Sequence, residues 1–140
     1  MNITRVLISG VIIWIVSFLF GWLTCAWLFN WVYELPPNIW VDPEIMMSTG
    51  NMIGVIIIGL IAAILFALVY AILYNGIPGD GIKKGLIYGF LMWLVGALVG
   101  MATMPFYMTI ATTVVIYWIL NALVINLING VILGAIYKKK

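Results

Sequence analysis

Four long apolar stretches, separated by short loops, make up most of this chain and restrict what it can fold into. They run from about residue 6 to 33, 45 to 74, 84 to 104 and 110 to 137, and Asp42 is expected to cap the start of the second. A helix that crosses a bilayer needs about 20 predominantly apolar residues. Only helices and closed barrels satisfy the backbone in lipid, and continuous rather than alternating hydrophobicity favours helices. The sequence therefore predicts an all-α membrane protein, a four-helix transmembrane bundle formed by a single domain over residues 1–140.

Composition supports a lipid environment and argues against several functions. The chain is 66% hydrophobic and 7% charged, whereas soluble domains carry about 25% charged residues. A net charge of +2, confined to helix ends, does not predict nucleic-acid binding. The chain contains no histidine, which removes the commonest ligand of haem and of many zinc and copper sites. We expect no cofactor, and we expect the lipid bilayer as the immediate environment.

The charged residues predict how the chain is oriented. Three of the four acids, Glu34, Asp42 and Glu44, fall between the first and second stretches, and the bases fall at the opposite ends: Arg5, Lys83, Lys84, Lys138, Lys139 and Lys140. Cytoplasmic loops carry the excess of basic residues, so both termini are expected to be cytoplasmic. The expected location is the plasma (inner) membrane, as a multi-pass protein. The expected markers of the inner interface are Tyr70, Tyr74, Tyr88 and Tyr137.

The interior of the four stretches offers little for catalysis. Apart from Lys84, the first residue of the third stretch, neither an acid nor a base lies within them, so a proton relay or a general base is not predicted. We expect that the protein is not an enzyme.

Small residues recur at helical spacing in all four stretches. Close approach of backbones drives helix association in lipid, so these residues predict contact faces. They serve either packing within the bundle or docking of a second chain. The predicted packing residues are Gly10, Ser17, Gly21, Gly50, Gly54, Gly59, Gly85, Gly89, Gly96, Gly100, Gly130 and Gly134.

Asparagines are the strongly polar side chains of these stretches. Asn121, Asn126 and Asn129 lie in the fourth, and Asn51 lies in the second. An amide in hydrocarbon needs hydrogen-bond partners. These residues are predicted to form interhelical hydrogen bonds. The alternatives are a polar track for a small solute and a contact with a partner.

Sulfur-bearing side chains are concentrated near the outer ends of the helices. Thioethers and thiolates suit Cu(I), although methionine also fills irregular gaps in packing. Resident metal is not expected, and the residues of the alternative Cu(I) site are Met101, Met104, Met108, Met46, Met47 and Cys25.

The overall layout resembles small uncharacterised prokaryotic four-span integral membrane proteins. The shared features are an early Arg5, a Lys83-Lys84-Gly85 start to the third helix and an Ile136-Tyr137-Lys138 ending. The resemblance implies topology and no activity.

The expected function is that of a structural or accessory subunit, packed through its glycine faces against other membrane subunits or against itself. A dimeric channel or transporter for a small solute is the first alternative. A Cu(I)-binding membrane protein is the second.

Overall fold

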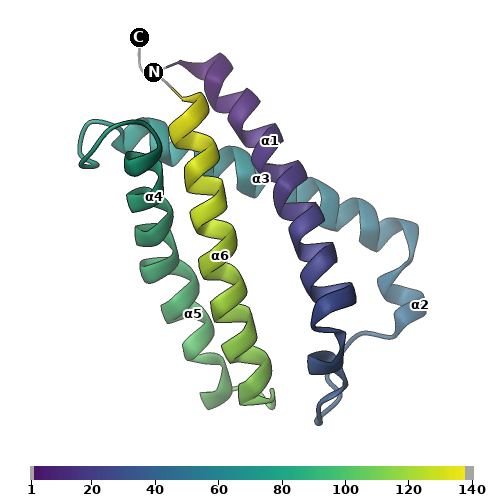
Figure 1. Cartoon of the computed structure of the whole chain (residues 1–140). Helices are drawn as coiled ribbons and strands as arrows, with labels where there is room; N and C mark the ends of the chain where they lie inside the picture. The colour runs from purple at the N-terminus through teal and green to yellow at the C-terminus, as the bar shows by residue number, and fades with distance from the viewer. Residues whose placement is uncertain (1, 138–140) are drawn as a thin grey trace.

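The computed structural model describes residues 2–137, and these contain helices and loops but no strand. The predicted all-α fold class is confirmed, because four helical segments are long and apolar enough to cross a membrane: Ile3–Leu28, Thr49–Leu73, Gly81–Phe106 and Thr112–Ile136. The two chain ends lie at the same end of the molecule (Figure 1). That this end is cytoplasmic remains a prediction. The expected anchors Lys138, Lys139 and Lys140 fall outside the described residues.

The first span changes its helical form along its length. α1 (Ile3–Gly21) starts at Asn2, whose side chain accepts a hydrogen bond from Arg5 N. It continues as the π-helix η1 (Trp22–Leu28) and then, after Phe29, as the 3-10 helix η2 (Asn30–Glu34). The regular α-helix therefore ends well before residue 33, where the apolar stretch ends.

The second stretch forms two helices rather than the expected single one from residue 45. α2 (Pro43–Met46) has Asp42 as its N-cap, which accepts a hydrogen bond from Glu44 N at 3.2 Å. The chain becomes extended at Ser48 before α3 (Thr49–Leu73) begins. The predicted cap at Asp42 is confirmed, but this cap belongs to a short separate helix.

The third and fourth spans complete the assembly. The third consists of α4 (Gly81–Met92), the π-helix η3 (Trp93–Leu98), α5 (Val99–Ala102) and the 3-10 helix η4 (Met104–Phe106). The fourth is one uninterrupted helix, α6 (Thr112–Ile136).

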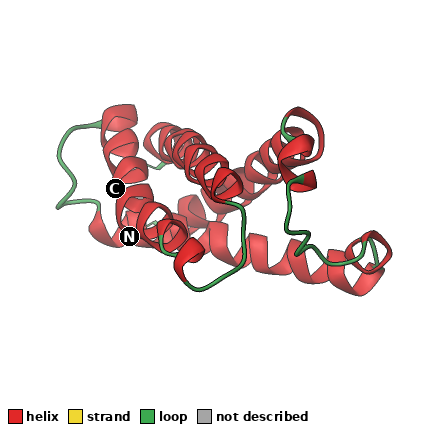
Figure 2. Ribbon diagram, turned by 90° about the horizontal axis from the view of Figure 1, so that it is seen from below, coloured by secondary structure: helices red, strands yellow, loops and turns green. Residues whose placement is uncertain are grey.

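The helices do not run uniformly parallel. α4 and α5 lie alongside α6, and α1 lies on the other side of α6, whereas α3 crosses behind them at a steep inclination (Figure 1). The view from below shows this long helix lying across the others (Figure 2). The buried residues of α3 are all in its second half: Ala63, Ala67, Tyr70 and Ala71. Its first half therefore diverges from the rest of the protein.

Two separate clusters of buried side chains stabilise opposite ends of the molecule. The first cluster lies near the chain ends and includes Tyr70, Tyr88 and Tyr137, each at most 1% exposed. The Tyr70 ring centroid lies 5.1 Å from that of Tyr88 and 5.7 Å from that of Tyr137. These tyrosines pack against each other, and their place at the inner interface stays a prediction. The second cluster consists of Val32, Ile110, Val114 and Val115.

Candidate functional site

α4 and α6 approach each other through glycines at matching heights. A Cβ atom added to Gly85 would overlap the Gly130 carbonyl and lie 2.8 Å from Gly134 N. A Cβ at Gly89 would likewise overlap the carbonyl of Asn126. Since a side chain at either position would collide with backbone, the contact requires glycine. Gly85, Gly89, Gly130 and Gly134 thus lie together in one helix contact of the kind that close backbone packing favours in lipid.

A second close contact joins α1 to α3. A Cβ atom at Gly10 would lie 2.9 Å from Ile64 Cα, and one at Gly59 would lie 3.4 Å from Trp14 Cδ1. This crossing involves the middle of α3, so it fixes the helix without covering its first half.

The other five predicted packing glycines face open space in the part of the chain that the structure describes. No heavy atom of residues 2–137, apart from the local helix backbone and the immediate neighbours, lies within 4 Å of a Cβ atom built on Gly21, Gly50, Gly54, Gly96 or Gly100. For Gly96 and Gly100 the π-helix η3 provides a reason. A π turn holds more residues than an α turn, so the residues after it rotate about the helix axis and leave the face shared by Gly85 and Gly89. Intramolecular packing therefore does not use these positions.

The free first half of α3 carries a shallow groove. Its volume is about 470 Å³, and it is lined by Gly50, Asn51, Gly54, Val55, Ile58 and Gly59. The glycines, which have no side chains, form its floor, and the branched side chains of Val55 and Ile58 form its walls. We call these six residues the α3 groove. All six lining residues belong to α3, whose first half diverges from the other helices (Figure 1).

The four predicted asparagines lie in different surroundings. Asn129 Nδ2 donates to Ser17 Oγ at 3.0 Å, which joins α6 to α1. Asn126 Nδ2 donates to Ala122 O of its own helix at 2.7 Å, and Asn51 Nδ2 donates to Met46 O at 3.0 Å. Asn121 lies half-buried on α6. The Asn129 bond therefore joins two spans, the Asn51 bond joins α3 to the adjoining short helix α2, and the Asn126 bond stays within α6.

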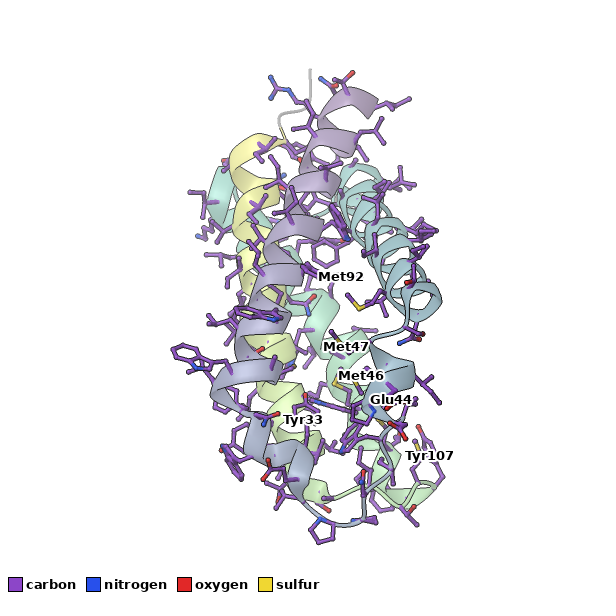
Figure 3. The ribbon with its side chains drawn as sticks, turned by 90° about the vertical axis from the view of Figure 1, so that its right-hand side faces the viewer. Tyr33, Glu44, Met46, Met47, Met92 and Tyr107 are labelled. Carbon is purple, nitrogen blue, oxygen red and sulfur yellow. The ribbon has the colours of Figure 1, made fainter. Side chains whose placement is uncertain are left out.

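The sulfur-bearing residues are spread over several places. Met101 and Met104 pack against the second buried cluster, and Met46 lies near Cys25 in the wall of a pocket. Met47 and Met108 are exposed, at 70% and 45%. Met46 and Met47 follow Glu44 at the end of α2, and Met46 lines the same pocket as Tyr33 (Figure 3). Within residues 2–137 no group of three or more His, Cys, Asp or Glu side chains could hold a metal ion.

Two basic side chains neutralise the carboxyl ends of helices to which they do not belong. Lys84 of α4 is 7% exposed, and its Nζ donates to Tyr74 O at the end of α3 at 2.8 Å while lying 4.2 Å from the centre of the Tyr74 ring. Arg5 Nη1 of α1 donates to Ile136 O at the end of α6 at 3.2 Å. Cations stabilise the free carbonyls and the negative dipole of such ends. The sequence analysis used both residues to predict the orientation of the chain and missed these contacts.

A pocket of about 1000 Å³ lies at the end of the molecule opposite the chain termini. Its lining comes from η1, η2, α2 and the loop between them: Cys25, Ala26, Asn30, Tyr33, Glu34, Asn38, Trp40, Val41, Asp42, Pro43 and Met46. Tyr33 OH donates to Cys25 Sγ at 3.1 Å and accepts from Trp118 Nε1 at 2.9 Å. Burial, with a further contribution from the Cys25 hydrogen bond, raises the pKa of Tyr33 to about 12. The sequence signal that could have located this pocket is the run of acids and aromatics after residue 30.

Comparison with protein-family models, with curated proteins and with solved structures finds no match for this chain.

Proposed function

We propose that the protein is a small integral membrane subunit without catalytic activity, which packs against a transmembrane helix of another membrane protein. The α3 groove carries this proposal. Within residues 2–137, a Cβ atom built on Gly50 or Gly54 meets no heavy atom within 4 Å outside the local backbone of α3, whereas one built on Gly85, Gly89, Gly130 or Gly134 meets the backbone of the facing helix.

The physics of helix association in lipid makes this difference relevant. Lipid tails are as apolar as leucine side chains, so exposed hydrophobic residues alone do not bring helices together. Glycines do bring helices together, because they let two backbones approach closely. Between the walls formed by Val55 and Ile58, the α3 groove offers a floor onto which the ridge of a second helix fits.

The rest of the chain holds α3 in place for such a contact. Gly10 and Ile64 fix its middle against α1, and Lys84 binds the carbonyl end of the helix through Tyr74 O. The first half is therefore presented from a fixed base. The asparagines and methionines of the two alternative functions are dispersed over separate parts of residues 2–137, so neither alternative has a comparably assembled site.

The test is isolation of the tagged protein from its native membrane in mild detergent, followed by mass spectrometry. We expect a stoichiometric larger membrane protein to accompany the wild type. A Gly50→Leu/Gly54→Leu double variant should lose it, because the side chains would fill the groove. Gly21→Leu is the matched control, since it also adds a side chain into open space but outside the groove.

Three results are informative. A partner lost only in the groove variant supports the proposal. A homo-oligomer lost in that variant would show that the groove binds a second copy of the chain. A strictly monomeric wild-type protein that isolates alone would overturn the proposal.

A further inference from the structure

The pocket at the end opposite the chain termini has a preformed aromatic wall. The rings of Tyr33 and Trp40 stand edge to face with centroids 5.0 Å apart. Trp40 Nε1 donates to Tyr33 O at 2.8 Å, and the Tyr33 hydroxyl is held by Cys25 and Trp118. These bonds fix both rings before any ligand arrives. The volume of about 1000 Å³ is at the upper end of the range for small-molecule sites.

The charged side chains that line the pocket are both acidic. Glu34 and Asp42 both line it, and Glu44 lies next to it in α2. The described bases lie elsewhere, because Arg5 contacts the end of α6, Lys84 contacts the end of α3, and Lys83 lies in the first turn of α4. The lining thus carries two carboxylates and no lysine or arginine. Walls of low dielectric concentrate the field of such charges inside a cavity.

This combination selects one kind of ligand. Aromatic faces attract cations through their quadrupole, most strongly when the cation is weakly hydrated. Carboxylates add long-range attraction, and the apolar remainder of the wall accommodates a hydrocarbon body. A bare metal ion does not fit, because the described residues hold no cluster of three candidate ligands.

We propose that this pocket binds an organic cation, of the quaternary ammonium or protonated aromatic amine type, with its charge near Glu34 and Asp42 and its apolar part against Tyr33 and Trp40. This site is separate from the α3 groove, and its occupancy does not depend on the function proposed for that groove.

The test compares two probes with similar bodies and opposite charges, benzyltrimethylammonium and phenylmethanesulfonate. Binding is measured by calorimetry on the full chain in nanodiscs of phosphatidylglycerol, whose headgroup carries no amine. Empty nanodiscs are titrated in parallel and subtracted. We expect saturable binding of the cation and at least tenfold weaker binding of the sulfonate.

Variants then locate the binding. Glu34→Gln/Asp42→Asn should weaken cation binding at least tenfold while leaving the melting temperature unchanged, because asparagine also caps a helix such as α2. Trp40→Leu should weaken it as well. Glu44→Gln is the matched control, removing a nearby acid outside the lining, and should change the dissociation constant less than twofold. Absence of saturation, equal binding of the two probes, or an unaffected double variant would overturn the proposal.

Discussion

The α4–α6 contact and the first half of α3 carry similar glycine spacing and have opposite surroundings. Gly85 and Gly130 lie in contact, so that neither position has room for a methyl group. Gly50 and Gly54 face open space. Glycine spacing therefore predicts that a helix has a flat face, whereas the inclination of that helix decides whether its own chain covers the face.

The largest expected effect tests this difference with the smallest possible change. Gly85→Ala adds one methyl group into the Gly130 carbonyl, and we expect a loss of about 3 kcal/mol or more in the free energy of unfolding, at the upper end for overpacked sites. Unfolding in mixed detergent, followed by circular dichroism, measures it. Gly54→Ala is the control and should be neutral or slightly stabilising, because alanine favours helix over glycine by up to about 1 kcal/mol. Equal losses in the free energy of unfolding for Gly85→Ala and Gly54→Ala would contradict the difference between the covered and the uncovered glycines.

The next effect concerns what holds the other end of α3. Lys84→Met leaves the Tyr74 carbonyl without its charged donor, so we expect a loss of about 2 kcal/mol, typical of hydrogen bonds to charged groups. Lys83→Met, the neighbouring exposed lysine, should change stability by less than about 0.5 kcal/mol. Thermal melting in detergent compares the two. If Lys84→Met and Lys83→Met have the same melting temperature, the stability of the α3 contact does not depend on Lys84.

A smaller effect is expected where α1 meets α6. Ser17→Ala removes the hydroxyl bonded to Asn129, and we expect a loss of about 1 kcal/mol, as for other interhelical hydrogen bonds in membranes. Thr103→Val is the control, since its hydroxyl bonds an exposed carbonyl of its own segment. The same melting experiment compares the two variants. An unchanged melting temperature for Ser17→Ala would show that this bond does not stabilise the contact between α1 and α6.

The smallest effect is spectroscopic and extends the comparison to the pocket. Tyr33 should ionise near pH 12 rather than 10, because burial disfavours its charged form. The folded protein then keeps a proton that the unfolded chain releases, so stability present below pH 10 is lost as the pH rises toward 12. Phenolate absorbance of the wild type minus that of Tyr33→Phe isolates this group. Cys25→Ala should lower the pKa, and ionisation near pH 10 in the wild type would contradict the burial.

The sequence predicts the existence of the four helices because hydrophobic runs of this length have few alternatives in lipid. It also predicts the cap at Asp42, which depends on local chemistry alone. The π-helices at Trp22 and Trp93 are not predicted, since their residues are largely as apolar as their neighbours. The break at Ser48 is not predicted either, although serine is a residue that favours the start of a helix.

Contacts between helices were predicted less well than the helices themselves. Residues in register on one helix, such as Gly85 and Gly89, can be recognised from spacing. The π-helix that turns Gly96 away, and the inclination that frees Gly50, depend on packing between distant segments. The role of Lys84 was missed for the same reason, because Tyr74 O becomes its partner only when α3 and α4 are placed together.

The bond from Arg5 to Ile136 O has a consequence for how the protein is made. The two residues are 131 positions apart, so α1 acquires this partner only after α6 has been synthesised. The residue that caps α6 is therefore made well before the helix that it caps. Docking of α1 against α6 is delayed until synthesis has passed Ile136, and a chain terminated before α6 lacks this contact.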